Sequence, residues 1–156
     1  MSSEYRVRNS IGYPTIVAQA SGLSQDMRGK VVETLDAMQE AFGPDQAVYV
    51  QSSVLKKLNS TDHDSTMWVR DLSQGFRRLF EYYRQIPSLE SQRGNMRWKL
   101  VGATLSYFVD PFGVVPDYIA PDGYVDDAFA FYYCVRQLPD DWDSRDEPLS
   151  EYLSAQ

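Results

Sequence analysis

Hydrophobic residues recur every three or four positions along most of this chain, the spacing that places side chains on one face of an α-helix. The first regular face follows Ser24, a residue type that often caps a helix, and consists of Met27, Val31, Leu35, Met38 and Phe42. Gly43 and Pro44 come directly after it and are typical of a helix end. The pattern therefore predicts a helix between Ser24 and Gly43.

The strongest amphipathic pattern lies between the polar loop 60–66 and Pro87. Its polar face holds most of the charged residues of the segment, and its apolar face consists of Val69, Leu72, Phe76, Leu79, Phe80, Tyr83 and Ile86. The segment 45–59 is less regular, because its apolar residues fit a helix while the stretch AVYV also fits a strand. We favour a helix there, since no partner strand is evident elsewhere.

Two further helices with apolar faces are predicted in the C-terminal part, one ending near Val109 and one from about Tyr124 to Leu138. The connector between them contains three prolines and is incompatible with a helix. The fold class predicted is all-α: a single-domain helical bundle of five or six helices over residues 23–139, with a C-terminal apolar helical hairpin at 96–138. Gly12, Pro14 and Gly22 interrupt residues 1–22, which we predict to form an extended N-terminal arm, and residues 140–156 form an acidic tail.

Composition limits the kind of protein this can be. With 156 residues, 43% of them apolar, the chain has the size of one domain with a real core. One cysteine, Cys134, excludes an intramolecular disulfide, and a single histidine and cysteine cannot supply the ligands of a tetrahedral zinc site. The N-terminus lacks the layout of a signal peptide, so the expected location is cytoplasmic.

The net charge of −7 is unevenly distributed along the chain. Residues 1–99 contain 13 Lys and Arg against 11 Asp and Glu, whereas residues 100–156 contain 2 against 11. An acidic C-terminal half is a poor surface for nucleic acid or an anionic membrane, because both need cationic contacts. A protein partner with a basic surface fits this half better.

Five aspartates lie between the two apolar arms of the predicted hairpin, and no other charged residue occurs between Lys99 and Arg136. Asp126 and Asp127 open the second arm, where carboxylates interact favourably with the helix dipole. A second reading is a magnesium, manganese or calcium site, because hard cations bind carboxylate oxygens; its ligands would be Asp110, Asp117, Asp126 and Asp127. A third reading pairs the aspartates with arginines of the preceding helices, which would lock the connector in place. The sequence leaves all three open, and we expect no other cofactor.

This stretch resembles the YkvA-like domain of unknown function, a short bacterial helical module. The resemblance covers about residues 96–138 and rests on an aromatic residue, a Pro-Asp pair and a following Asp-Asp pair at the family's spacing, with the matching positions Tyr107, Pro111, Val115, Pro116, Asp117, Ile119, Gly123, Asp126 and Asp127. Asp110, Gly113 and Ala120 depart from the pattern, and Gly113 replaces an acid that a three-aspartate metal site would use. The family implies a helical fold and brings no established activity.

Several residues are candidates for contact with other molecules. Tyrosine is an efficient contact residue, which makes Tyr49 and the N-terminal tyrosines candidates for a protein interface. The interface residues predicted in the arm and the tail are Tyr5, Tyr13, Asp140, Asp141, Trp142 and Asp143. His63 lies between Asp62 and Asp64 in a loop, yet it has no nucleophile or second base beside it, and we expect a solvated side chain.

The first functional hypothesis is a non-enzymatic helical protein-interaction module of the adaptor or inhibitor type, whose acidic half meets a basic partner. The alternative is a divalent-metal-dependent helical enzyme of hydrolytic type that uses the aspartate cluster. A weaker alternative is a peripheral membrane protein that uses the apolar hairpin 100–138, whose arms are shorter than the roughly 20 residues of a membrane span. The partner, the substrate and the oligomeric state do not follow from the sequence.

Overall fold

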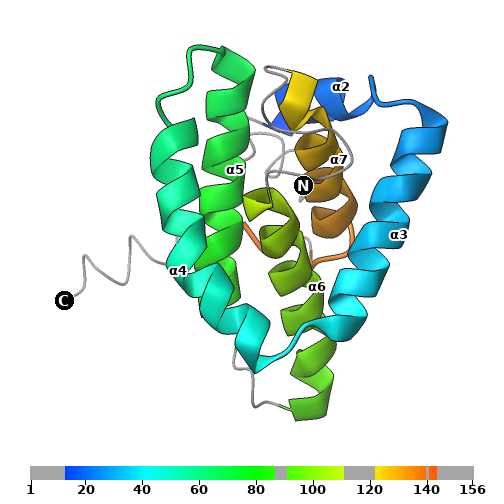
Figure 1. Ribbon diagram of the computed structural model, residues 1–156, viewed down its shortest axis with the longest axis vertical. Coiled ribbons are helices and arrows are strands. Elements are labelled where there is room, and N and C mark those ends of the chain that lie inside the picture. The colour runs from blue at the N-terminus through cyan, green and yellow to red at the C-terminus, as the bar shows by residue number, and fades with distance from the viewer. Residues whose placement is uncertain (1–12, 87–90, 111–121, 140, 144–156) are drawn as a thin grey trace.

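The computed structural model describes residues 13–86, 91–110, 122–139 and 141–143, and within these ranges the chain is helical without any strand (Figure 1). This confirms the predicted all-α, single-domain bundle. The described elements are α2 (Tyr13–Ala20), α3 (Gln25–Ala41), α4 (Pro44–Thr61), α5 (Met67–Arg84), α6 (Ser91–Val109), the short 3-10 helix η1 (Asp122–Tyr124) and α7 (Val125–Val135).

The prediction of an extended N-terminal arm is wrong for residues 13–20, which form α2. Pro14 lies in the first turn of this helix, where the amide hydrogen that proline lacks would have had no partner within the helix. α2 packs against α7 and α5, and Ile16 is fully buried in that contact region. Residues 1–12 lie outside the described residues.

The predictions for α3 and α4 are confirmed. The Ser24 side chain caps α3 by accepting a hydrogen bond of 3.2 Å from the backbone N–H of Met27. The uncertain segment 45–59 belongs to α4, and its apolar face is buried completely: Val50, Val54 and Leu58. The periodicity of these residues therefore outweighed the strand propensity of the short run AVYV.

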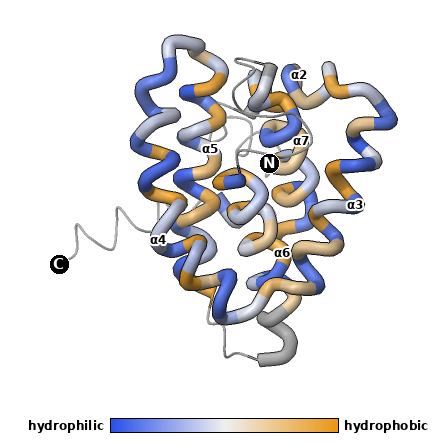
Figure 2. Tube along the Cα trace, in the orientation of Figure 1, coloured by the Kyte–Doolittle hydropathy of each residue, from blue (hydrophilic) through white to orange (hydrophobic). Residues whose placement is uncertain are grey.

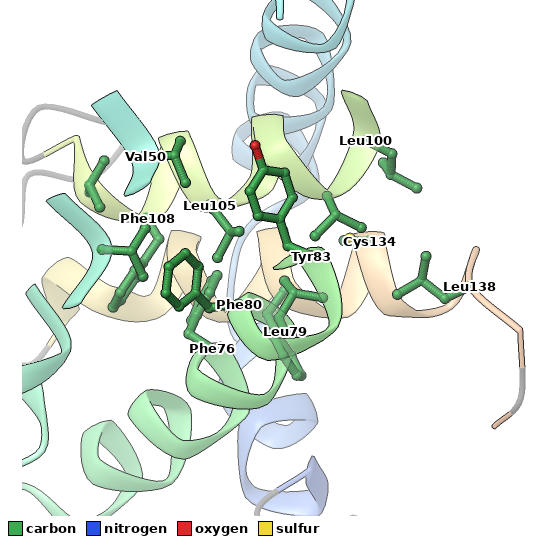
Figure 3. Packing of buried hydrophobic residues seen from close by; sticks show 14 of the residues in the cluster. Val50, Phe76, Leu79, Phe80, Tyr83, Leu100, Leu105, Phe108, Cys134 and Leu138 are labelled. Atoms are coloured by element: carbon green, nitrogen blue, oxygen red, sulfur yellow. The ribbon is translucent and has the colours of Figure 1, made fainter. Parts of the chain in front are cut away.

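α6 lies in the middle of the bundle and contacts α3, α4, α5 and α7 (Figure 1). All residues from Leu100 to Val109 are buried, which is expected for a helix that is apolar on every side. The ring of Phe108 stacks on Phe76 of α5 at a centroid distance of 4.1 Å, within the cluster drawn in Figure 3. Among the described helices, none combines the length and the apolar character that crossing a bilayer requires.

Phe42 fixes the turn between α3 and α4 to the central helix. Its ring makes edge contacts with Trp98 of α6 and Tyr83 of α5, at centroid distances of 4.8 and 6.3 Å. The ring lies directly on Gly102, where a Cβ atom would come within 2.3 Å of the Phe42 Cζ atom. Any larger residue at position 102 would push Phe42 out of its position. We call this corner of the bundle, where the α3–α4 turn meets α6, the elbow.

We expect Gly102→Ala to lower the free energy of unfolding by about 1–3 kcal/mol, because the added methyl group overpacks the contact with Phe42. Gly29→Ala in α3 is the matched control, since a Cβ atom there meets nothing within 4 Å. Alanine should stabilise that exposed helical position by about 0.5–1 kcal/mol. Urea unfolding followed by circular dichroism measures both changes, and stabilisation by both alanines would contradict the proposed role of Gly102.

Candidate functional site

Two of the predicted aspartates, Asp126 and Asp127, lie in the first turn of α7 and are each only 1% exposed. The hydroxyl of Tyr107 on α6 donates a hydrogen bond of 2.7 Å to Oδ2 of Asp126. This bond joins the two helices of the C-terminal hairpin inside the bundle. A buried carboxyl group is costly unless it is hydrogen-bonded, so Tyr107 contributes directly to keeping Asp126 in the core.

The other two predicted metal ligands are Asp110 and Asp117. Asp110 follows the last residue of α6 and is half-buried, and Asp117 lies outside the described residues. In the ranges that the structure describes, no group of three or more His, Cys, Asp or Glu side chains is arranged to hold a metal ion. The magnesium, manganese or calcium site stays a prediction.

Some arginines expected near the aspartates have contacts elsewhere. Arg77 forms an ion pair with Asp62, and Nη1 of Arg97 donates a hydrogen bond of 3.2 Å to the Tyr82 hydroxyl. The Ser73 hydroxyl donates a hydrogen bond to Asp62, and it lies 2.7 Å from the hydroxyl oxygen of Thr61, which is also buried. These contacts join the end of α4 to α5. The sequence reasoning missed this network because its members lie up to sixteen positions apart on two helices.

His63 is exposed, and its Nδ1 atom lies 3.0 Å from the backbone oxygen of Asn59. The Asp64 side chain accepts a hydrogen bond of 2.9 Å from the backbone N–H of Thr66. The two acids beside His63 thus stabilise the α4–α5 connection. Cys134 is fully buried, and burial raises the pKa of its thiol to about 12, well above that of a reactive thiolate.

The predicted interface residues near the C-terminus fall into two environments. Trp142 is 3% exposed and packs edge-on against Tyr82 and Phe131, at centroid distances of 5.8 and 6.2 Å. Asp143 is also buried, and Asp141 is exposed. Tyr5 and Asp140 lie outside the described residues, as does the side chain of Tyr13, the first residue of α2.

The structure adds a cleft of about 270 Å³ at the elbow, which the sequence reasoning did not find. This elbow cleft lies between the end of α3, the start of α4 and the end of α6. Its walls are mainly apolar, and Asp110 is the one charged residue among the described residues that line it. These residues are Met38, Ala41, Phe42, Gln46, Tyr49, Ser106 and Asp110.

Ser106 lines this cleft, and its hydroxyl is an unusual buried group. The residue is 8% exposed, and its Oγ atom has no hydrogen-bond partner among the described residues. Leaving a buried hydroxyl without a partner costs about 1–3 kcal/mol.

Next to the elbow cleft, three apolar side chains of α4 point into solvent. Val48 is 69% exposed, Tyr49 53% and Leu55 44%. Val48 and Leu55 are separated by seven positions, two helical turns, and therefore lie on the same face. Tyr49 also lines the elbow cleft. We call these three residues the outer face of α4; Figure 2 shows hydrophobic positions interleaved with hydrophilic ones along this helix.

Comparison with known proteins gives one match. Residues 97–133 match the model of a family described as "Protein of unknown function (DUF1232)", which confirms the resemblance inferred for the C-terminal segment. The matched region comprises most of α6, the connector and most of α7. No curated protein and no solved structure matches the chain.

We expect Tyr107→Phe to lower the free energy of unfolding by about 1–3 kcal/mol, because it removes the donor to a buried carboxyl oxygen. Tyr133→Phe is the control: this half-buried tyrosine lies on the same hairpin, and its hydroxyl has no hydrogen bond with any of the described residues. It should change the stability by less than about 0.5 kcal/mol. Equal urea midpoints for Tyr107→Phe and the wild type would show that the Tyr107–Asp126 bond contributes nothing.

Proposed function

We propose that the protein is a non-enzymatic protein-interaction module that binds a basic, partly apolar segment of a partner protein at the elbow. The observation that supports this most directly is the outer face of α4, whose three apolar side chains are 44–69% exposed. Apolar groups that cluster on the surface of a helix gain free energy when a partner removes them from water.

The elbow cleft supplies the second element of a docking surface. Its volume of about 270 Å³ suits one large side chain of a partner, and Tyr49 joins it to the outer face of α4. Binding energy in protein interfaces concentrates where an anchoring side chain fills such a desolvated pocket. Gln46 and Asp110 add polar side chains to the otherwise mainly apolar lining of the elbow cleft.

The charge around the elbow selects the partner. Residues 31–57 contain four acids, Glu33, Asp36, Glu40 and Asp45, against two lysines, Lys56 and Lys57. Asp110 adds a carboxylate at the cleft itself. This surface repels the phosphates of nucleic acids and attracts cationic peptide segments. An arginine or lysine anchor combines the apolar stem that the cleft walls accept with a charged end group that Asp110 attracts.

The test uses a defined peptide because the natural partner is unidentified. The probe is a fluorescent amphipathic peptide of leucine and arginine, about four helical turns long, and the comparison peptide carries glutamate in place of arginine. We expect the arginine peptide to bind with an affinity that falls when the salt concentration rises. The double substitution Val48→Ser and Leu55→Ser should weaken this binding at least about tenfold, equivalent to roughly 1.4 kcal/mol.

The matched control replaces Met67 and Met96 by serine, because these residues are equally exposed apolar side chains on α5 and α6. Unchanged binding by this control, together with the loss caused by the α4 variant, supports the proposal. Equal binding of the glutamate peptide would overturn it, as would equal effects of the two serine pairs. Self-association of the free protein that the α4 variant abolishes would instead identify a second copy of the chain as the occupant.

A further inference from the structure

A second cavity, of about 230 Å³, lies where α2, the start of α3 and the end of α7 meet. Two arginines, Arg28 of α3 and Arg136 at the end of α7, line it together with the aromatic residues Phe129 and Tyr132. No acidic residue of the described part of the chain lines it. In a chain with a net charge of −7, a cavity with two cations and no anion is a local reversal of the overall charge.

Arg28 is held in place by the backbone of the α2–α3 turn. Its Nε atom donates a hydrogen bond of 2.9 Å to the Leu23 carbonyl, and Nη2 donates one of 2.7 Å to the Ser21 carbonyl. A guanidinium group carries five N–H donors in a rigid plane. The two bonds to carbonyls therefore fix its orientation and leave further donors for a ligand.

Arg136 faces the same cavity from the other side. It is exposed, and its guanidinium carbon lies 5.2 Å from the centroid of the Tyr132 ring, in a cation–π contact. Neither Arg28 nor Arg136 forms an ion pair with a carboxylate among the described residues. Two like charges at one cavity repel each other, and an anion bound between them would attract both and outweigh that repulsion.

We propose that this cavity binds a small phosphate monoester. Two guanidinium groups match the charge of about −1.5 to −2 that a phosphate monoester carries at neutral pH, and arginine forms paired hydrogen bonds with phosphate oxygens. Phe129 and Tyr132 provide an aromatic surface for the organic group of the ligand. The site is independent of the elbow and of the function proposed for it.

The test titrates the full-length protein with inorganic phosphate and with phenyl phosphate, by calorimetry and by thermal melting. We expect phenyl phosphate to bind more tightly than inorganic phosphate because of its ring, and both to raise the melting temperature. Arg136→Gln should weaken both affinities at least about tenfold. This variant should fold normally, since Arg136 is exposed and its side-chain contact is with the surface of Tyr132.

Arg84→Gln is the matched control. Arg84 is also exposed, lies at the end of α5 and makes a similar contact with an aromatic ring of its own helix, Phe80 at 5.5 Å, but it does not line the cavity. Its substitution should leave the affinities unchanged. The proposal is overturned by the absence of binding at about 10 mM ligand, a concentration that detects even weak complexes. Equal binding by Arg136→Gln and the wild type would also overturn it.

A third arm separates a soluble phosphate from a lipid headgroup. Vesicles of phosphatidylcholine with and without phosphatidic acid present the same phosphate monoester on a membrane. Binding to the phosphatidic acid vesicles without binding of phenyl phosphate would overturn the proposal of a small soluble ligand. Binding of phenyl phosphate with no retention on the vesicles would support it.

Discussion

The contact between Phe42 and Gly102 is the constraint on which the elbow depends. Because Gly102 has no side chain, the Phe42 ring reaches the backbone of α6, where Trp98 and Tyr83 also contact it. Aromatic pairs of this kind contribute about 0.5–1.5 kcal/mol each beyond the burial of their area. The contact holds the ends of α3 and α4 at a fixed distance from α6, and the gap that remains beside Phe42 is the elbow cleft.

The helices were predictable where one helix face carries the apolar residues, as in α3 and α5, because local periodicity reflects burial directly. The sequence pattern does not predict α2 because proline usually interrupts a helix, whereas Pro14 occupies the first turn of this one. The elbow cleft was beyond sequence reasoning for a different reason. Met38, Tyr49 and Ser106 line it from three helices, and only the tertiary packing brings these positions together.

The acidic elbow and the arginine-lined cavity lie at opposite ends of one helix, α3. Thirteen residues separate Arg28 from Ala41, which corresponds to about 20 Å along a helix with a rise of 1.5 Å per residue. This separation is about twice the Debye length at physiological salt, so the two surfaces scarcely influence each other through solvent. The net charge of −7 is therefore the sum of regions that differ in sign. The acidic elbow suits a cationic ligand, and the arginine-lined cavity suits an anionic one.

The chain after α7 begins as part of the core. Trp142 packs against Tyr82 of α5 and Phe131 of α7, and Asp143 beside it is 3% exposed. Changing these residues would disturb the packing of the bundle as well as any partner contact, so a loss of binding there would be ambiguous. Val48 and Leu55 depend less on the core, because 69% and 44% of their surface already faces water. Substitutions on the outer face of α4 should therefore alter the proposed interaction without altering the fold.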